Sequence, residues 1–340
     1  MFSRLFYDLL RLYVHAGLKF YFNRIEVRGA GKLPADVPLF FTANHQNSFL
    51  DAILIAVTQN RRLYFLVRSD VFKNSVARRF LNALNMMPVY RIRDGWSSIQ
   101  NNRKTFDATA QLLKNHSAIL IFPEGNHSIQ RRLRPLSRGF TKPITQAIQS
   151  VPELPVFVVP VGLNFSAHLD FRSSVSVLYG APISVQEFCT NGQLDANMLR
   201  DKLTTEMKSL ITHIEDQSRY DEIISRVESQ NPDYLDPDSV NRLINSDVTT
   251  VVEKLPLNSG LLQVISRFIH YIPLVGWSVL RKKIKDPVFT GSIRFVYGIF
   301  IFPLYYIFIF LFLNFFVCWY YATIIVLLIV VSSMWMRRNQ

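Results

Sequence analysis

A histidine and an aspartate six positions apart, His45 and Asp51, are the side chains of this sequence best suited to moving a proton. They lie in a polar stretch between the apolar run 38–41 and the apolar-periodic segment 49–57. Histidine titrates near neutrality, and a neighbouring carboxylate can fix its tautomer and raise its basicity. The pair is therefore predicted to act as a general base with an orienting acid, suited to an alcohol substrate.

The spacing limits how these two side chains can meet. On one continuous helix, residues six apart lie roughly 240° apart around the axis and do not touch. They can meet if His45 stays in a loop and Ser48 caps the helix that carries Asp51. In the alternative interpretation, Asp51 is a capping-box residue behind Ser48, and His45 is a polar turn residue. The spacing alone leaves both interpretations open.

A second polar corner follows the apolar run 118–122. It contains Glu124, Gly125, Asn126 and His127. Gly125 permits a tight turn or a close backbone approach to a ligand. Glu124 either accepts hydrogen bonds from a hydroxylated substrate or ties down the turn.

Four arginines follow within eight residues: Arg131, Arg132, Arg134 and Arg138. Guanidinium groups bind phosphate through two parallel hydrogen bonds, so the group predicts an anion site. For any single member, a solvated basic loop is the simpler interpretation. Arg91 follows another short apolar run and is expected at the same edge of the sheet.

The frame that must position these side chains is predicted to be α/β. Residues 25–180 alternate short apolar runs with longer helical patterns, which indicates helices layered on a mostly parallel or mixed central sheet. Ligand sites of such sheets lie at the carboxyl ends of strands. Pro160 is expected to mark an edge strand or a bulge. Strands are expected at 38–42, 62–67, 87–91, 118–122, 156–163 and 175–179, and helices at about 49–58, 70–84, 96–115 and 139–150.

The C-terminal tract from Phe295 to Met336 contains 42 residues and no charge. As a helix it would reach roughly 63 Å, about twice the ~30 Å hydrocarbon core of a bilayer. A transmembrane hairpin is therefore predicted within 294–340, with a short turn near Asn314. Basic residues before and after the tract predict that both ends, and the catalytic domain, face the cytoplasm.

The net charge of +13 implies an anionic partner, either a membrane surface or nucleic acid. No basic module interleaved with aromatic residues occurs, which disfavours nucleic acid. Segment 1–24 fits either an interfacial helix on a membrane or an amphipathic helix packed on the core. Only Cys189 and Cys318 are present, which is consistent with a reducing compartment, and no metal-ligand spacing occurs.

The order of four sequence blocks over about 25–190 resembles the glycerolipid acyltransferases, the phospholipid/glycerol acyltransferase superfamily. The resemblance implies His45 as general base and Asp51 as its partner. The block 86–91 resembles the acceptor-binding block, in which Arg91 matches the arginine. The last block, 159–161, is often linked to the acyl donor.

Phe122-Pro123-Glu124-Gly125 matches the block whose glutamate and glycine help to hold glycerol and phosphate. The chain departs from the family pattern at two places. Five residues separate the histidine from the aspartate instead of four, as in a branch that resembles the eukaryotic glycerol-3-phosphate/dihydroxyacetone-phosphate acyltransferases. Asn126-His127-Ser128 replaces Thr-Arg-Ser, so the arginine that would face phosphate is missing at position 127, and Arg131, Arg132 or Arg134 could supply that charge.

The resemblance implies direct acyl transfer from acyl-CoA or an acyl-carrier protein to glycerol 3-phosphate or a lysophospholipid, without a metal or cofactor. Another lysolipid or hydroxyl acceptor, or a non-catalytic membrane scaffold, remains an alternative. The expected plan is an N-terminal helix at 1–24, an acyltransferase domain at 25–227, a linker and interfacial segment at 228–293 and a hairpin at 294–340.

Overall fold

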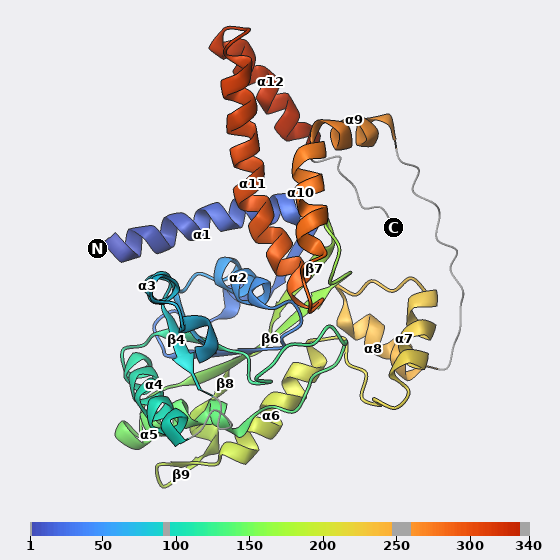
Figure 1. Ribbon diagram of the computed structural model, residues 1–340. Coiled ribbons are helices and arrows are strands. Elements are labelled where there is room, and N and C mark those ends of the chain that lie inside the picture. Colours follow the sequence, from blue (N-terminus) through green and yellow to red (C-terminus); the bar gives the residue numbers. More distant parts are fainter. Residues whose placement is uncertain (1, 91–95, 247–259, 334–340) are drawn as a thin grey trace.

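The computed structural model describes residues 2–90, 96–246 and 260–333 (Figure 1). Its strands are β1 Arg24–Arg28, β2 Leu39–Ala43, β3 Leu63–Arg68, β4 Met86–Val89, β5 Ala118–Ile121, β6 Phe157–Phe165, β7 Ser174–Tyr179, β8 Ile183–Ser184, β9 Cys189–Thr190 and β10 Gln193–Leu194. Its helices are α1 Phe2–Tyr21, α2 Phe49–Thr58, α3 Ser75–Ala83, α4 Trp96–Lys114, α5 Lys142–Ser150, α6 Ala196–Ser209, α7 Tyr220–Ser229, α8 Pro237–Asn245, α9 Leu261–Ile269, α10 Tyr271–Arg281, α11 Phe289–Leu313 and α12 Trp319–Ser332.

The main sheet has the strand order β1-β7-β6-β2-β5-β3-β4, and β8 pairs with β6. From β6 to β4 the neighbours run parallel, whereas β7 and β8 pair with β6 in the antiparallel sense. The predicted α/β fold with a mostly parallel or mixed sheet is confirmed. Because parallel strands end at the same edge, the segments after β2, β3 and β5 lie close together.

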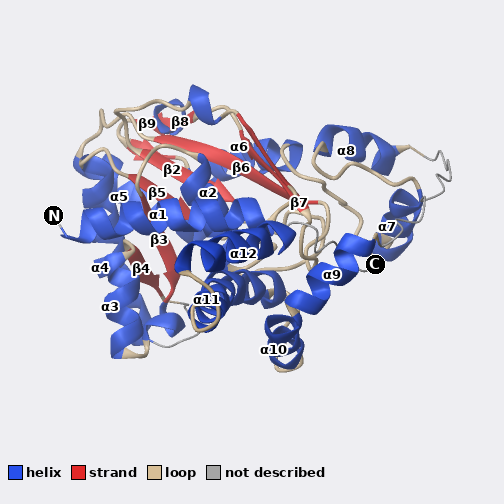
Figure 2. Ribbon diagram, turned by 90° about the horizontal axis from the view of Figure 1, so that it is seen from above, coloured by secondary structure: helices blue, strands red, loops and turns tan. Residues whose placement is uncertain are grey.

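Apolar side chains form a separate core on each face of the sheet. Successive strand residues point to opposite faces, so Phe41 belongs to the core under α1 and α2, whereas Phe40 belongs to the core under α4, α5 and α6. Seen from above, α1 and α2 lie across one face of the sheet (Figure 2). The corner that contains His45 leaves the sheet toward this face.

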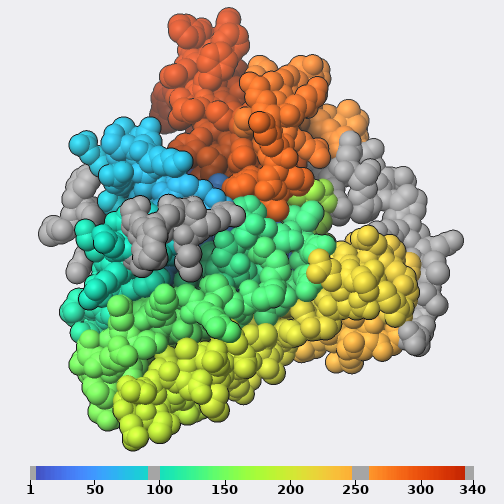
Figure 3. Space-filling model, turned by 60° about the horizontal axis from the view of Figure 1, so that its bottom comes forward, coloured from blue at the N-terminus to red at the C-terminus, as the bar shows by residue number. Residues whose placement is uncertain are grey.

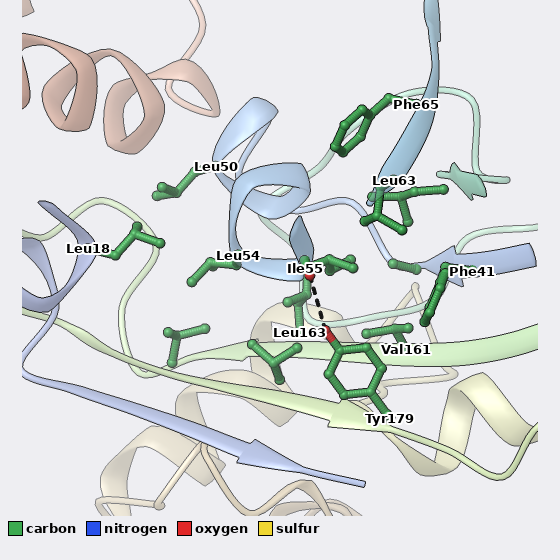
Figure 4. Close-up of a cluster of buried hydrophobic side chains, with 14 of the residues drawn as sticks. Leu18, Phe41, Leu50, Leu54, Ile55, Leu63, Phe65, Val161, Leu163 and Tyr179 are labelled. Carbon is green, nitrogen blue, oxygen red and sulfur yellow. Dashed lines mark hydrogen bonds between the residues drawn. The ribbon is translucent and has the colours of Figure 1, made fainter. Parts of the chain in front are cut away.

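Helix α2 has the bounds that the apolar pattern predicts. Leu50, Leu54 and Ile55 are fully buried against the sheet, and the Tyr179 hydroxyl donates a hydrogen bond to the Ile55 carbonyl at 3.3 Å (Figure 4). Burying each of these aliphatic side chains contributes about 1.5–3 kcal/mol. The first turn of α2, which carries Asp51, is therefore held on a rigid support.

The structure adds the short strands β8, β9 and β10 to the predicted elements and differs from the prediction in two further respects. The charged edge strand β1, which pairs with β7, does not show an apolar run and was not expected. The expectation that Pro160 marks an edge strand is wrong, because β6 lies between β2 and β7. On the side of β6 away from β2, residues 157–158 pair with β8 and residues 161–165 pair with β7. Pro160 lies between these two pairings, so its missing N–H breaks no hydrogen bond to either strand.

The beginning of the predicted segment 228–293, residues 228–239, was expected to be a linker but packs against the rest of the chain. Tyr234 and Leu235 are buried, and α8 begins within the linker at Pro237. Side chains of this stretch form a small third core with α7. The prolines and polar residues of this stretch therefore form a compact turn between the short helices α7 and α8.

The C-terminal helices project from the body as an orange and red lobe (Figure 3). Within the described part of the chain, α11 is the one helix long and apolar enough to cross a membrane, with 25 residues and a mean hydropathy of 2.3 over its most apolar window. Helix α12 follows the expected short turn but has only 14 residues, about 21 Å, so a second span is not confirmed.

Helix α1 packs one face on the core and exposes apolar residues on the other. Leu18 and Tyr21 are buried, whereas Leu5, Leu9 and Leu12 are exposed. Packing on the core is thus observed, and the exposed leucines leave the interfacial interpretation as a prediction.

Candidate active site

The corner after β2 is tied to the neighbouring strand by Asn44. Its side-chain amide donates to the Leu163 carbonyl at 3.0 Å, and its carbonyl oxygen accepts from the Leu163 N–H at 2.8 Å. The paired bonds imitate one more step of the ladder between β2 and β6. Sequence reasoning missed this function of Asn44, although its place directly before His45 was a signal.

The structure brings His45 and Asp51 together. His45 Nδ1 lies 2.8 Å from Asp51 Oδ2, and the Asp51 side chain is fully buried. The same oxygen accepts the backbone N–H groups of Gln46 at 2.9 Å and Asn47 at 2.8 Å. Ser48 occupies the N-cap position of α2 with φ 51° and makes no side-chain cap, so the capping-box interpretation is wrong.

The His45 ring is oriented on two sides. It stacks on Phe122, with ring centroids 3.9 Å apart and 13° between the planes. A carboxylate can only accept hydrogen bonds, so the Nδ1 atom that faces Asp51 carries the proton. Nε2 then holds the lone pair, and the arrangement can act as a general base toward a hydroxyl group.

Glu124 joins the two polar corners. Its Oε1 accepts the backbone N–H of His45 at 3.0 Å, and its Oε2 accepts from Arg134 Nε at 2.6 Å. Burial raises the pKa of Glu124, and the charge of Arg134 opposes that shift. Gly125 turns the chain with φ 69°, and the carbonyl of exposed Asn126 accepts a second Arg134 hydrogen bond. Glu124 and Arg134 thus fix the relative position of the two corners.

His127 lies edge-on to His45, with ring centroids 5.6 Å apart. Its Nε2 is 3.5 Å from Asp286 Oδ2, and its ring packs against Phe289 at 4.7 Å. Burial is the main cause that lowers the pKa of His127. Positive charge on His45 and Arg68 lowers it further, whereas Asp286 raises it. His127 is therefore a largely neutral group beside the base.

The structure separates the predicted arginines. Arg131 is only 7% exposed, and its guanidinium donates to the carbonyls of Phe165 at 2.8 Å and Ser166 at 3.2 Å. It also lies 3.3 Å over the centre of the Tyr234 ring. The prediction that Arg131 meets substrate is wrong, because this side chain connects β6 to the α7–α8 unit.

Arg132, Arg134 and Arg91 have different surroundings. Arg132 lies near His213, whose pKa is lowered chiefly by burial and to a smaller extent by this arginine. Arg134 stays beside Glu124 in the corner. Arg91 lies outside the described residues, so its predicted contact with the acceptor stays a prediction.

Residues far along the chain complete the corner. Asp286 and Phe289 contact His127, and Ser292 contacts the loop between His45 and Asp51. No local sequence signal links them to a site about 160 to 245 positions earlier. Arg68, at the end of β3, did carry a signal, because it follows an apolar run just as the two predicted corners do.

Comparisons with known proteins show what this part of the chain is similar to. A family model described as Acyltransferase matches residues 24–164. Residues 24–164 thus match an acyltransferase domain, and the curated relatives similar to this part of the chain are glycerophosphate acyltransferases. The matched part of this domain contains both polar corners and ends before the C-terminal helices.

Two curated relatives are similar to the acyltransferase domain. Glycerol-3-phosphate O-acyltransferase 2 of Saccharomyces cerevisiae is 25% identical over 167 residues, which cover 47% of this chain and 21% of that protein. The chloroplastic 1-acyl-sn-glycerol-3-phosphate acyltransferase BAT2 of Brassica napus is 27% identical over 143 residues, which cover 42% of this chain and 39% of that protein. The matches thus span well under half of each relative's length.

A solved structure was also found. The crystal structure of the 1-acyl-sn-glycerophosphate (LPA) acyltransferase PlsC from Thermotoga maritima is similar with a TM-score of 0.45 and 17% sequence identity. The likeness covers 61% of this chain and 79% of that chain.

Proposed function

We propose that this protein is a membrane-bound O-acyltransferase that transfers a fatty acyl group from an acyl thioester to the hydroxyl of a glycerophosphate acceptor. The observation that carries the proposal is the 2.8 Å contact of His45 Nδ1 with buried Asp51, which leaves Nε2 as a base. The curated relatives, named for glycerol 3-phosphate and 1-acylglycerol 3-phosphate, supply the acceptor class.

The reaction follows from the orientation of the base. His45 Nε2 takes the proton of the acceptor hydroxyl while that oxygen attacks the thioester carbonyl. The new ester forms as the carbon–sulfur bond breaks, and the leaving thiolate takes the proton back from His45. Asp51 stabilises the imidazolium that exists between these steps. A positioned general base of this kind contributes about 10²–10⁴ in rate.

Direct transfer needs both substrates bound together, and no metal or cofactor takes part in these steps. The donor is acyl-CoA or an acyl-carrier protein, whose thioester supplies the activated acyl group. Holding both reactants in one complex removes much of the entropic barrier.

We assign the acceptor phosphate to the corner after β5. His127 lies beside His45, and Arg134 bonds to Glu124 and to the Asn126 carbonyl in the same corner. Arg68 at the end of β3 pairs with Asp70, and its charge acts on His127. We keep Arg91 in this group as a proposal from the sequence. We place Glu124 behind these groups, as the residue that holds Arg134 in position.

One observation favours a second acceptor class. His127 stands where the resembled family has an arginine, and its lowered pKa keeps it largely neutral. The corner therefore offers less fixed positive charge than a site built only of arginines. A lysolipid or hydroxylated lipid without a terminal phosphate is the alternative acceptor.

We propose that the catalytic domain works at the cytoplasmic surface of a membrane. Helix α11 is about 37 Å long and has the composition of a span. Leu9 and Leu12 of α1 and Leu261 and Phe268 of α9 are exposed apolar residues suited to the interface. In this proposal α11 and α12 form the hairpin, and both of its ends lie in the cytoplasm with the domain.

An acceptor panel tests the function. Membranes that contain the protein receive one labelled acyl thioester, either coenzyme A or carrier-protein linked, with glycerol 3-phosphate, 1-acylglycerol 3-phosphate or a phosphate-free lysolipid. We expect a new ester only with phosphate-bearing acceptors. Equal turnover of a phosphate-free acceptor would favour the alternative, and no turnover with any pair would indicate a scaffold.

A further inference from the structure

The first turn of α11 reaches into the loop that joins His45 to Asp51. The fully buried Ser292 donates a hydrogen bond from Oγ to the Asn47 carbonyl at 2.6 Å and accepts one from the Leu50 N–H at 3.0 Å. The neighbouring Gly291 lies so close that a Cβ there would meet Asn47 Oδ1 at 2.5 Å. The first turn of α11, about 240 residues further along the chain, thus packs directly against the catalytic loop.

That loop has a conformation which needs outside support. Ser48 has φ 51° and ψ −137°, a combination rare for residues with a side chain, inside a turn closed by the Leu50 N–H on the Asn47 carbonyl at 3.2 Å. Such backbone persists only when its surroundings over-determine it. The Ser292 hydroxyl bonds to the same two groups that close the turn, and it therefore fixes the turn from outside.

The turn sets the position of the catalytic carboxylate. The Asn47 N–H donates to Asp51 Oδ2 at 2.8 Å, while the Asn47 carbonyl accepts from Ser292. One peptide segment thus connects α11 to the oxygen that orients His45. A shift of α11 moves Asn47, and with it the hydrogen bonds that hold Asp51.

The same turn of α11 is anchored to the domain on its other side. The Tyr21 hydroxyl donates to the Gly291 carbonyl at 3.1 Å, and the buried Phe295 ring packs edge-on against Tyr21 at 5.5 Å. The Arg294 guanidinium donates to the Leu169 carbonyl at 2.9 Å. Ile299 still packs on the core, and its carbonyl accepts from the Tyr13 hydroxyl of α1. Further along, the helix presents apolar side chains such as Leu304 and Leu311 to its surroundings.

We propose that Ser292 is a positioning residue that couples the seating of α11, and so the placement of the membrane hairpin, to the geometry of His45 and Asp51. The catalytic loop is competent when α11 is seated against it and loses its alignment when α11 shifts. The lipid bilayer into which the hairpin inserts controls this coupling. The activity readout rests on the proposed function, whereas the exchange readout below does not.

The test compares Ser292→Ala with Ser266→Ala. Ser266 is an equally buried serine of the same helical lobe, and its Oγ donates to the Ser332 carbonyl at 2.7 Å without contacting the catalytic loop. Both variants remove one buried hydroxyl from the full chain in lipid vesicles. The measurements are kcat, the KM values of donor and acceptor, and amide hydrogen exchange by mass spectrometry.

We expect Ser292→Ala to lower kcat by about 10- to 100-fold with both KM values unchanged, because misplacing the base affects the chemical step. Amides of 45–51 should exchange about tenfold faster, while those of β2 and β5 stay protected. Ser266→Ala should change none of these. Unchanged exchange at 45–51, equal losses in both variants, or faster exchange throughout the sheet would each overturn the proposal.

Failure of the proposed function gives a different result. If the unaltered protein turns over no acceptor, the acyltransferase proposal fails, and the exchange of 45–51 still decides whether Ser292 holds the loop. If turnover is normal in Ser292→Ala and its exchange is unchanged, the function stands and the coupling is wrong.

Discussion

Leu54 and Leu311 show how two regions of this chain use the same side chain in opposite ways. Leu54 of α2 has no exposed surface and packs between helix and sheet, whereas Leu311 of α11 is 56% exposed. The sheet domain buries its core side chains between helices and sheet, and Phe295 from the first turns of α11 joins one of these cores. The C-terminal lobe leaves most of its apolar surface uncovered, which is expected of helices that complete their burial in lipid.

The two regions also divide the work of the site. The domain supplies the base, the carboxylate and the charged corner, and all of these follow strands or begin helices. The lobe supplies Asp286, Phe289 and Ser292, which contact the corner from the first turn of α11 and the loop before it. If the division is correct, changes in the domain should alter chemistry and folding, and changes beyond Ile299 should alter membrane attachment.

The largest expected effect is on chemistry in the domain. His45→Ala removes the base, so we expect kcat to fall by about 10²–10⁴. Expression and membrane retention should be unchanged, because the side chain is partly exposed and does not belong to either core. A labelled-thioester assay on membranes measures the loss. Retained turnover would remove His45 from the mechanism.

Replacing the two leucines tests the contrast in burial directly. Leu54→Ala should cost about 2–5 kcal/mol of unfolding free energy, because it leaves a cavity between α2 and the sheet. Leu311→Ala should change the free energy of unfolding of the sheet domain by less than about 0.5 kcal/mol. Denaturant unfolding of detergent-solubilised protein measures both. Equal losses would show that the lobe is part of the domain's core.

Acidification should act on the domain through His168. This half-buried ring lies 3.1 Å from the Gln46 side-chain oxygen, and the loss of solvent around it, together with the charge of Arg131, lowers its pKa well below the ordinary value of 6.5. The unfolded state therefore takes up the proton first, and stability falls as pH drops below about 6.5. One such group contributes a slope of at most about 1.4 kcal/mol per pH unit.

His168→Gln tests that contribution. The variant should lose less stability between neutral and acidic pH than the unaltered protein, as measured by denaturant unfolding at several pH values. His116→Gln is the control, because His116 is exposed. An unchanged slope in His168→Gln would assign the acid sensitivity to other groups.

The smallest perturbation tests the topology of the lobe. Cys318 is exposed in the turn between α11 and α12, and Cys189 is the other free cysteine. In a Cys189→Ser background, a spanning hairpin presents Cys318 to a membrane-impermeant maleimide added on the side opposite the domain. Protection from both sides, lost only in detergent, would mean that the turn ends inside the bilayer.

The sequence predicted best where the structure is local. The bounds of α2 and the strands before both corners depend on residues within about ten positions of each other. Alternating burial and helical spacing are sufficient to place such elements. The prediction of an edge strand at Pro160 was wrong. A proline disrupts a sheet only where a neighbouring strand would accept a hydrogen bond from that residue's backbone N–H.

The four arginines after Gly125 show where local prediction stops. Their spacing indicated an anion site, and Arg134 does lie in the corner. Arg131 turns instead to the end of β6 and to Tyr234, both of which are distant in sequence. The composition of a loop cannot indicate which of its side chains will be buried by segments that fold against it later in the chain.

The sequence by itself determined the α/β alternation, the position of the histidine–aspartate pair at a strand end and the long uncharged tract. These follow from periodicity and composition, which the chain carries locally. Only the tertiary structure decided which arginine pairs with Glu124 in the corner, and that Ser292 closes the turn at Ser48. Both depend on where distant segments pack, and side-chain direction is set by that packing.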